Sequence, residues 1–360
     1  MSPRPTARRF AVVGCGSIGL RHLRNLRTLG CTDLVAVDPD RASRDRAAAE
    51  TGALPLPDLA AALAAGSSVV LVTTPTALHL APALEAVRAG ADLFVEKPLA
   101  ASLDGSDELI DEADRRGTIA LVACNLRFHP GLVQLRELAT AGAIGRVLSA
   151  RIEFGSWLPG WRPTTDYRTG YAARRELGGG IVLDAIHELD YARWLLGDVA
   201  SVACFADHVS TLELDTEDVA AILLRFASGA IGEVHLDYLQ RSYSRTCQLI
   251  GDAGTLRWDF TAGETQLFDA ETGGWQSFPD PPGWETNAMY VAELEHFLAC
   301  LAYEAEPAQD LRAGRRALEI ALAALTSAED GVVVRLGAPA APARAAPAAA
   351  PAAAPARMAA

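Results

Sequence analysis

The sequence predicts an α/β domain with a doubly wound parallel sheet, followed by an α+β domain with a large open sheet of mixed or antiparallel strands. Three observations support this fold class. The 360 residues suffice for two domains. The first third alternates short apolar runs with helical patterns, as βαβ units do. After about Arg146, strand-like runs follow one another with short turns. We expect the domains to cover residues 10–124 and 125–336.

The first domain is expected to begin with a β-strand that leads into a helix. Phe10 to Val13 is a short apolar run, and Ser17 to Leu29 has helical periodicity. The same alternation continues along the chain. Further strands are expected at 33–37, 69–73, 92–95 and 119–123, and further helices at 41–50, 79–89, 102–116 and 129–140.

The second domain is expected to be rich in strands, with its helices set apart from them. Turns such as Ala227-Ser228-Gly229 are short enough to join neighbouring antiparallel strands. Strands are expected at 147–154, 202–205, 219–226, 230–238 and 246–250, and helices at 182–196, 287–303 and 311–326.

The two ends of the chain differ in composition from the rest. Residues 1–9 are basic, and we expect them to be flexible. Residues 337–360 are almost entirely alanine and proline, and prolines at this spacing prevent a stable helix. We expect a disordered tail there, with a partner-binding segment as the alternative.

Charge and cysteine usage exclude several classes of partner. The formal net charge of −13 disfavours binding to nucleic acid or to an anionic membrane. No uncharged apolar stretch of about 18 residues could span a bilayer, and no cleavage-site pattern follows the basic start. The six cysteines form no C-x-x-C pair, so we expect neither disulfides nor a metal site. We expect a cytoplasmic protein.

A glycine loop joins the first strand to the first helix. Gly14-Cys15-Gly16-Ser17-Ile18-Gly19 fits the pattern G-x-G-x-x-G in the strand–turn–helix context that a dinucleotide site requires. Such glycines allow a tight turn and the close approach of a pyrophosphate, which then accepts hydrogen bonds from free helix amides. The loop therefore predicts an NAD(P) site; the alternative is a plain glycine turn.

An acidic residue ends the second strand at the distance that this cofactor requires. Asp38 lies nineteen residues after Gly19. A carboxylate there accepts hydrogen bonds from the hydroxyls of the adenosine ribose and repels a 2′-phosphate. The sequence thus favours NAD, and the nearby Arg41 keeps NADP possible.

A lysine closes a buried-looking strand at Val95-Glu96-Lys97-Pro98. In open parallel sheets, ligands bind beyond the carboxyl ends of the strands, so this lysine would lie near the nicotinamide end of the cofactor. Taken alone, Glu96-Lys97 would favour an exposed charge pair before a proline turn.

Other motifs occur with this lysine in the order of one known family. These motifs are the glycine loop, Thr74-Pro75 followed by His79, Glu96-Lys97-Pro98, and Gly178-Gly179-Gly180 followed by Asp184 and His187. Over about residues 10–336 the chain resembles the Gfo/Idh/MocA oxidoreductases. The resemblance implies a Rossmann domain, a second domain with a large open sheet that often forms homodimers or homotetramers, and NAD(P)-dependent oxidation or reduction of a sugar, cyclitol or similar polyol.

The resemblance also implies the site residues. The family's lysine, aspartate and histidine correspond to Lys97, Asp184 and His187 in this sequence. Family members usually place the histidine four residues after the aspartate; here the spacing is three, and Glu188 occupies the usual position. Both spacings put the two side chains on one face of a helix. The residues expected to bind the cofactor are Gly14, Gly16, Ser17, Ile18, Gly19, Asp38, Thr73, Thr74, Pro75, His79, Glu96, Lys97 and Asn125.

The expected chemistry is hydride transfer between C4 of the nicotinamide and a secondary alcohol or ketone. His187 suits the role of general base or acid because an ordinary histidine pKa of about 6.5 lies near working pH. Asp184 is expected to orient His187 or to bind the reacting hydroxyl. Lys97 is expected to hydrogen-bond the developing alkoxide, with its pKa lowered by burial and by the positive nicotinamide.

Several further residues are candidates for contact with the small-molecule substrate. Arg127 follows the last Rossmann strand. The segment before the triple glycine contains Tyr167, Arg168 and Tyr171. These candidates can bind sugar hydroxyls, a carboxylate or a phosphate. Tyr238, like His235 and Arg241, fits an exposed sheet position better than a substrate contact. The full set is Arg127, Tyr167, Arg168, Tyr171 and Tyr238.

Two other functions remain open at this stage. The same resemblance includes glycosidases that oxidise and re-reduce their sugar with bound NAD, and a non-catalytic NAD-binding regulator is a third possibility. Release of NADH during turnover separates a dehydrogenase from both. The run from Asp184 to Asp190, with Trp161-x-Pro163 and Asp166-Tyr167-Arg168 upstream, resembles a branch associated with surface-polysaccharide sugars.

Overall fold

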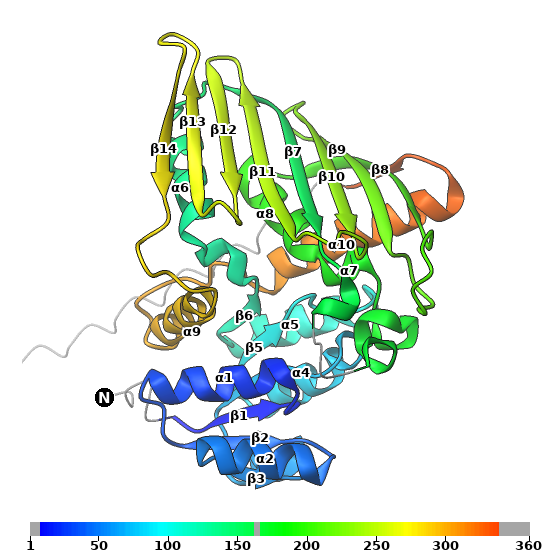
Figure 1. The fold of residues 1–360 in the computed structure, drawn as a ribbon. Helices are drawn as coiled ribbons and strands as arrows, with labels where there is room; N and C mark the ends of the chain where they lie inside the picture. Colours follow the sequence, from blue (N-terminus) through cyan, green and yellow to red (C-terminus); the bar gives the residue numbers. More distant parts are fainter. Residues whose placement is uncertain (1–7, 162–165, 338–360) are drawn as a thin grey trace, which may run out of the picture.

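The computed structural model describes residues 8–161 and 166–337, which form two β-sheets at opposite ends of the molecule (Figure 1). The first sheet has six parallel strands in the order β3-β2-β1-β4-β5-β6. This order confirms the predicted doubly wound sheet. Its strands are β1 (Phe10–Val13), β2 (Leu34–Val37), β3 (Leu54–Leu56), β4 (Val69–Val72), β5 (Asp92–Glu96) and β6 (Ala120–Ala123).

Helices cover both faces of the first sheet because its central strands are apolar on both sides. These helices are α1 (Ser17–Thr28), α2 (Arg41–Thr51), α3 (Leu59–Ala64), α4 (Leu80–Arg88) and α5 (Ser106–Arg116). Leu23 of α1 and Ala47 of α2 pack against one face. Ala62 of α3, Val87 of α4 and Leu109 of α5 pack against the other.

A helix from near the end of the chain completes the layer that α1 and α2 form. Helix α9 (Asn287–Leu301) buries Leu294 and Phe297 in the same core cluster as Leu23 of α1. The rings of Phe297 and Phe94 of β5 lie 5.4 Å apart. A segment expected in the second domain therefore packs on the first sheet, which brings its side chains close to the strand ends.

The second sheet has nine strands in the order β14-β13-β12-β11-β7-β10-β9-β8-β15. Only β7 and β10 pair in parallel, so the predicted mixed, mainly antiparallel sheet is confirmed. The strands are β7 (Val147–Gly155), β8 (Val199–Asp207), β9 (Val219–Phe226), β10 (Ile231–Asp237), β11 (Ser244–Gly251), β12 (Gly254–Asp259), β13 (Glu264–Asp269), β14 (Gly274–Pro279) and β15 (Val334–Arg335).

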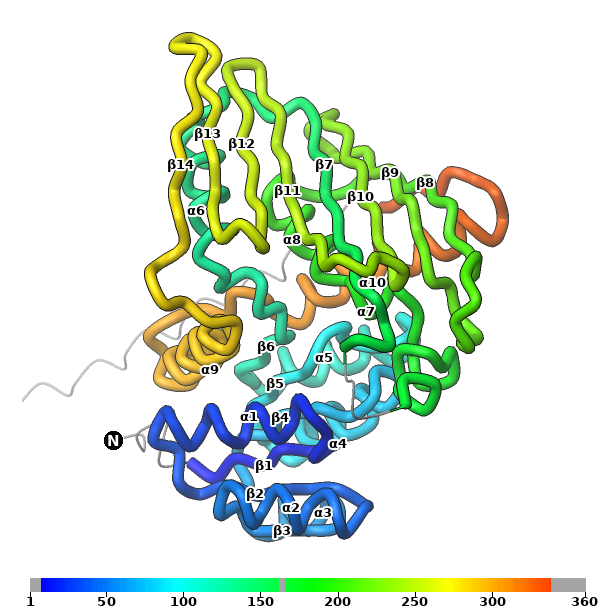
Figure 2. The backbone as a smooth tube through the Cα atoms, viewed as in Figure 1, coloured from blue at the N-terminus to red at the C-terminus, as the bar shows by residue number. Residues whose placement is uncertain are grey.

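In the described part of the chain, helices cover one face of this sheet and not the other. They are α6 (Pro130–Thr140), α7 (Ile181–Asp184), α8 (Ile186–Leu196) and α10 (Leu311–Asp330), and Figure 2 shows α6, α8 and α10 on the same side of the strands. Leu189 of α8 and Leu318 of α10 pack in one core cluster with Ile222 and Val234 of the sheet. Side chains alternate between buried and exposed along β9 and β10, so the opposite face lies open.

Several elements differ from the sequence prediction. Strand β3 and helix α3 were not expected, because β3 is a three-residue edge strand that contains Pro55, and α3 is too short to show periodicity. Strands β12 to β14 were not expected either. All but one residue of β14 are exposed, so its sequence has no apolar alternation. The helix expected at 182–196 is interrupted at Ala185, where α7 ends and α8 begins.

The ends of the chain bear on two further predictions. Of the expected flexible N-terminus, Arg8 and Arg9 lie among the described residues: Arg8 forms an ion pair with Asp92 at 2.6 Å, and Arg9 pairs with Asp33 at 2.8 Å. The rest of the expected flexible N-terminus, residues 1–7, lies outside the described residues, as does the expected tail after Gly337.

The described part of the chain also bears on membrane, disulfide and metal predictions. It contains no helix that is long and apolar enough to cross a membrane. All six cysteines are buried and unpaired. Residues 8–161 and 166–337 contain no cluster of three or more side chains suited to hold a metal ion.

Candidate active site

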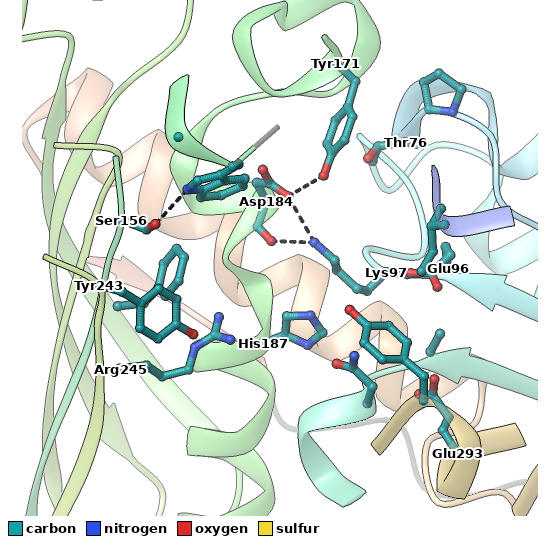
Figure 3. Close-up of a pocket in the computed structure, with 18 of the residues that line it drawn as sticks. Thr76, Glu96, Lys97, Ser156, Tyr171, Asp184, His187, Tyr243, Arg245 and Glu293 are labelled. Carbon is teal, nitrogen blue, oxygen red and sulfur yellow. Dashed lines mark hydrogen bonds and ion pairs between the residues drawn. The ribbon is translucent and has the colours of Figure 1, made fainter. Parts of the chain in front are cut away.

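A cavity of about 640 Å³ lies where the carboxyl ends of the first sheet's strands face the second sheet. This is the edge at which open parallel sheets bind ligands. Figure 3 shows the cavity with Lys97 and Asp184 between its walls. Its lining comes from α1, from the ends of β4, β5 and β6, from β7, α7 and α8, from the segment between β10 and β11, and from α9.

The glycine loop is built as a phosphate-binding turn. Gly14 has φ of 100°, and a Cβ there would lie 2.8 Å from the carbonyl oxygen of Thr73. A Cβ on Gly19 would lie 1.9 Å from the carbonyl oxygen of Gly14, whereas a Cβ on Gly16 would meet nothing within 4 Å. No side chain caps α1, and its first turn has no acidic residue. The helix amides therefore face open space and can bind an anion.

Asp38 lies beside this loop. Its Oδ2 accepts a hydrogen bond from the backbone N–H of Cys15 at 2.7 Å, and its Oδ1 accepts one from the backbone N–H of Asp40 at 2.9 Å. Arg41 is exposed and pairs with Asp45 on its own helix at 3.2 Å. The Asp38 carboxylate thus lies at the glycine loop, whereas Arg41 is paired with Asp45 of α2.

The segment after β4 is held in place by side chains that the sequence predicted for the cofactor. The hydroxyl of Thr73 donates to the carbonyl oxygens of Val13 and Gly14, at 3.0 and 2.7 Å. Buried His79 lies with Nδ1 2.8 Å from the Pro98 oxygen and Nε2 2.9 Å from the Thr74 oxygen. Thr74, Pro75 and His79 line the cavity, while Thr73 fastens the loop behind it.

Lys97 and Asp184 form an ion pair in the centre of the cavity. The Lys97 Nζ lies 3.0 Å from Asp184 Oδ1 and 2.6 Å from its backbone oxygen. Burial lowers the pKa of Lys97, but Asp184 and Tyr171 outweigh burial and raise that pKa above its usual range. The expected lowering by burial is present, but the prediction left out these partners, which reverse the net direction of the Lys97 pKa shift in the absence of a cofactor.

Two tyrosines complete the surroundings of Asp184. The hydroxyl of Tyr171 donates to Oδ1 at 2.5 Å, and the hydroxyl of Tyr238 donates to Oδ2 at 3.2 Å. Both carboxylate oxygens are thereby engaged, and neither is bonded to His187 among the described residues. The Asp184 carboxylate is therefore bonded to Lys97 and to the two tyrosines. One of its two expected roles was to orient His187, and these contacts do not support that role.

His187 faces the same cavity from the start of α8 (Figure 3). Burial, with Lys97 and Arg245 nearby, lowers its pKa well below the usual value, so the ring is neutral. Its buried Nδ1 has no hydrogen-bond partner within residues 8–161 and 166–337. Because the helix breaks at Ala185, Asp184 and His187 do not share one helix face, contrary to the prediction.

Glu188 occupies the position where the family usually has its histidine, and it lies outside the cavity lining. Its side chain is fully buried and pairs with Arg245, whose Nε lies 2.8 Å from Glu188 Oε1. The structure thus brings His187, and not Glu188, to Lys97.

Four of the five predicted substrate residues lie away from the main cavity. Arg127 is buried in a double hydrogen bond with Asp190, at 2.8 and 2.7 Å. Tyr238 is fully buried and hydrogen-bonded to Asp184, so its alternative placement at an exposed sheet position is wrong. Exposed Arg168 pairs with Asp166, while Tyr167 lines a smaller neighbouring cavity. Of the five, Tyr171 alone lines the main cavity.

The far wall of the cavity was missed by sequence reasoning. The Arg241 guanidinium lies 3.5 Å from the ring centre of Trp157, and that of Arg245 lies 4.3 Å from the ring centre of Phe154. Arg241 therefore borders the cavity, although its sequence position suggested an exposed sheet residue. The end of β7 lies beside the start of β11 because the two strands pair, and no local sequence pattern predicts that pairing.

The wall formed by α9 was also missed. Tyr290 and Glu293 line the cavity beside Asn125, the predicted cofactor residue after β6. One signal was available: Glu293 stands among the apolar positions of an amphipathic helix, next to Leu294 and one turn before Phe297. An acidic residue on a core-facing stripe points to a specific role.

Comparison with known proteins agrees with this geometry. Residues 8–124 match the oxidoreductase family with an NAD-binding Rossmann fold, and residues 132–257 match the GFO/IDH/MocA C-terminal domain. A D-apiose dehydrogenase from Paraburkholderia graminis is 30% identical, over 92% of this chain and 91% of its own length. The chain belongs to the Gfo/Idh/MocA oxidoreductase family. The sequence-based resemblance is thereby confirmed.

Two further Gfo/Idh/MocA relatives cover nearly the whole chain. An NAD⁺-dependent scyllo-inositol 2-dehydrogenase from Bacillus subtilis is 28% identical over 91% of this chain and 96% of its own length. The crystal structure of GenD2 from gentamicin A biosynthesis, in complex with NAD, is 27% identical with a TM-score of 0.79. It covers 94% of this chain and 100% of its own.

The residues present fit the NAD that this family binds. Open space lies in front of Gly16 and the uncapped amides of α1, as a pyrophosphate requires. Asp38 stands at the end of β2 with its carboxylate at the loop, where a ribose would be bound. At the other end, Asn125 Oδ1 is buried without a hydrogen-bond partner in the described residues.

Lys97 is the only lysine in the sequence, so its ionisation can be measured directly. Reductive ¹³C-methylation labels this side chain and the α-amino group, and NMR then follows each resonance against pH. We expect Lys97 to titrate above the ordinary lysine pKa of about 10.4. In Asp184→Asn the burial persists without the carboxylate, so the Lys97 pKa should fall below that of the parent. The surface variant Asp45→Asn should leave the Lys97 pKa unchanged. A Lys97 pKa near neutrality in the parent would contradict this assignment.

Proposed function

We propose that this protein is an NAD-dependent dehydrogenase or reductase that acts on a secondary alcohol or ketone of a sugar, cyclitol or sugar derivative. The observation that carries the proposal is the Lys97–Asp184 ion pair beside neutral His187, in a cavity at the carboxyl end of a Rossmann sheet. Relatives that act on D-apiose and on scyllo-inositol support a polyol substrate. Surface-polysaccharide sugars are one such class.

When bound, NAD accepts or supplies the hydride. In the proposed arrangement, the loop Gly14–Gly19 and the amides of α1 hold the pyrophosphate, and Asp38 holds the adenosine ribose. The end of the cavity nearest the first sheet is lined by Thr74, Pro75 and Asn125, which follow β4 and β6. NADP remains the alternative, and Asp38 disfavours it by charge repulsion.

In this proposal Lys97 stabilises the oxygen of the reacting carbon. Its raised pKa keeps it an ammonium ion at working pH, so it donates a hydrogen bond to the developing alkoxide or polarises a carbonyl. Asp184 fixes the ammonium, and Tyr171 and Tyr238 fix Asp184. This arrangement orients the donor before the substrate arrives, which reduces reorganisation during the reaction.

We assign the proton transfer to His187. The ring is neutral in its surroundings, so it can accept the hydroxyl proton of an alcohol during oxidation and return it during reduction. Glu188 cannot substitute for it directly, because Arg245 holds its carboxylate outside the cavity. On the far wall, Trp157 and Arg241 are available to contact the rest of the substrate.

The experiment that tests this function is a panel of polyols, aldoses and nucleotide sugars with NAD and NADP in parallel, monitored by the absorbance of NADH or NADPH. We expect the reduced cofactor to accumulate in step with substrate consumption, with NAD preferred. Turnover of a glycoside without accumulation would instead identify the NAD-dependent glycosidase. Cofactor binding without any turnover would identify a regulator.

Gly16→Ala separates cofactor binding from folding. Because a Cβ at Gly16 meets no protein atom within 4 Å, the fold should tolerate it, while the methyl group would occupy the space that a pyrophosphate needs. We expect the Kd for NAD to rise by about tenfold or more, or about 1.4 kcal/mol. Thermal unfolding should be nearly unchanged. Gly274→Ala on edge strand β14 is the matched control, and equal NAD affinity in both variants would refute the loop assignment.

We also propose a homodimer or homotetramer formed through the open face of the second sheet. Exposed apolar side chains on that face support the proposal: Phe205 is 87% exposed and Leu223 is 53% exposed. A cytoplasmic location is proposed as well, and the six unpaired cysteines support it.

A further inference from the structure

Three carboxyl side chains line the cavity, and only one of them has no partner in the described residues. Asp184 is bound by Lys97. Glu96 Oε1 lies 2.7 Å from Nε2 of buried His22, and its Oε2 accepts from the backbone N–H of Lys97 at 3.2 Å. Glu293 is fully buried, and neither of its carboxyl oxygens has a hydrogen-bond partner within residues 8–161 and 166–337. Burying a carboxyl group without a partner costs folding free energy, unless a bound ligand supplies the missing partner.

The position of Glu293 indicates which ligand this is. The residue projects from α9, which packs on the first sheet, and it lines the cavity near the end of β6 together with Asn125. Figure 3 shows Glu293 on the side of Lys97 that lies away from Asp184. Substrate chemistry is assigned to the Asp184 and His187 side. The Glu293 side therefore belongs to the cofactor end of the cavity.

Within residues 8–161 and 166–337, the charged groups around Glu293 offer it no free cation, because the Lys97 ammonium that lines the same cavity is held by Asp184. Glu96 of β5 and Asp190 of α8 repel its negative charge, and after burial they are the causes that raise the pKa of Glu293 well above its usual value. From the segment after β6, Arg127 is held by Asp190 at 2.7 Å, and the Cys124 thiol is buried.

Helix α1 supplies two further titratable groups that face α9, and both are occupied. The Arg21 guanidinium lies over the ring of Tyr290 at 4.5 Å, and His22 is hydrogen-bonded to Glu96. Burial and the two neighbouring acids thus favour the protonated form of the Glu293 carboxyl group. A cation that enters the cavity would stabilise its carboxylate form.

We propose that Glu293 distinguishes the two redox states of the cofactor, with its carboxylate acting as the counter-ion of the oxidised nicotinamide ring. The inference rests on the proposed function, because it requires NAD to occupy this cavity. The ring of NAD⁺ carries a positive charge, and the ring of NADH carries none. Hence NAD⁺ binding should break the O–H bond of the Glu293 carboxyl group and release its proton to solvent, whereas NADH binding should leave it in place.

Isothermal titration calorimetry measures this proton directly. NAD⁺ and NADH are titrated into the protein at pH 6 and 7, in two buffers of different ionisation enthalpy, for the parent, Glu293→Gln and Glu295→Gln. Glu295 lies exposed on the same helix and is the matched control. Circular dichroism verifies that each variant is folded. Glutamine keeps the size of Glu293 and removes its proton.

We expect the parent and Glu295→Gln to release about one proton per NAD⁺ and none with NADH. Glu293→Gln should release none with either cofactor. It should also bind NAD⁺ roughly tenfold more weakly than the parent while its affinity for NADH is unchanged. Equal proton release in the parent and Glu293→Gln, or equal loss of affinity for both cofactors, would overturn the counter-ion role. If neither the parent nor the two variants bind either cofactor, the proposed function itself fails. That outcome is distinct from failure of the counter-ion role alone.

Discussion

Lys97→Met is expected to lower kcat by about 10²- to 10³-fold, the usual effect of removing one preorganised donor to a developing oxyanion. Methionine keeps the apolar stem and removes the ammonium that Asp184 holds 3.0 Å from its Oδ1. The affinity for NAD should change little, because the glycine loop and Asp38 lie elsewhere. Steady-state kinetics of NADH formation and a direct NAD titration measure the two quantities separately.

The control for this variant is Arg88→Met, which removes a cation from the surface ion pair with Glu108 on the outside of α4 and α5. It should leave kcat unchanged. An unaltered kcat in Lys97→Met would mean that Lys97 does not contact the reacting oxygen. A loss of NAD affinity comparable to the loss of kcat would instead assign Lys97 to cofactor binding.

His187→Ala is expected to lower kcat by about 10²- to 10⁴-fold, the range typical of a lost general base. The pH dependence of the parent gives a second readout. Oxidation requires neutral His187, and burial lowers its pKa well below the ordinary value of about 6.5. The parent should therefore keep full kcat/KM as the pH falls through 6.5 and lose activity only at lower pH. The acidic limb due to His187 should be missing in the variant.

Two comparisons make the His187 result decisive. His208→Ala replaces a histidine away from the cavity, whose ring lies 3.6 Å from Asp218, and kcat should not change. Glu188→Gln should mainly reduce stability, because Glu188 is the buried partner of Arg245. If Glu188→Gln abolished turnover in a folded protein while His187→Ala did not, the base would be assigned to the wrong residue.

Most of the first sheet could be predicted from its sequence because each strand is a continuous apolar run bounded by a turn. Leu34–Val37 and Val69–Val72 are such runs, and all their residues are buried. The end of the second sheet could not be predicted in the same way. In Gly274–Pro279 nothing is fully buried, so the strand exists only through its pairing with Glu264–Asp269. Pairing of this kind leaves no periodic pattern in the strand itself.

The candidate site shows the same limit at the level of single residues. Lys97 could be found because a motif places it at a strand end, and His187 because the family resemblance implies it. The role of Asp184 could not, because its partners Tyr171 and Tyr238 meet it only in the folded chain. Glu293 lies nearly two hundred residues from Lys97 in the sequence, and only the packing of α9 on the first sheet brings them to one cavity.

Direct hydride transfer in this cavity is the central claim, and isotope transfer tests it most directly. The secondary alcohol that gives the fastest NAD reduction is prepared with deuterium on its carbinol carbon and turned over once by the parent enzyme. We expect the reduced cofactor to carry one deuterium at C4 for each ketone formed, and almost no reduced cofactor from Lys97→Met in the same time. Ketone formed with the deuterium lost to water, or reduced cofactor without label, would contradict the account.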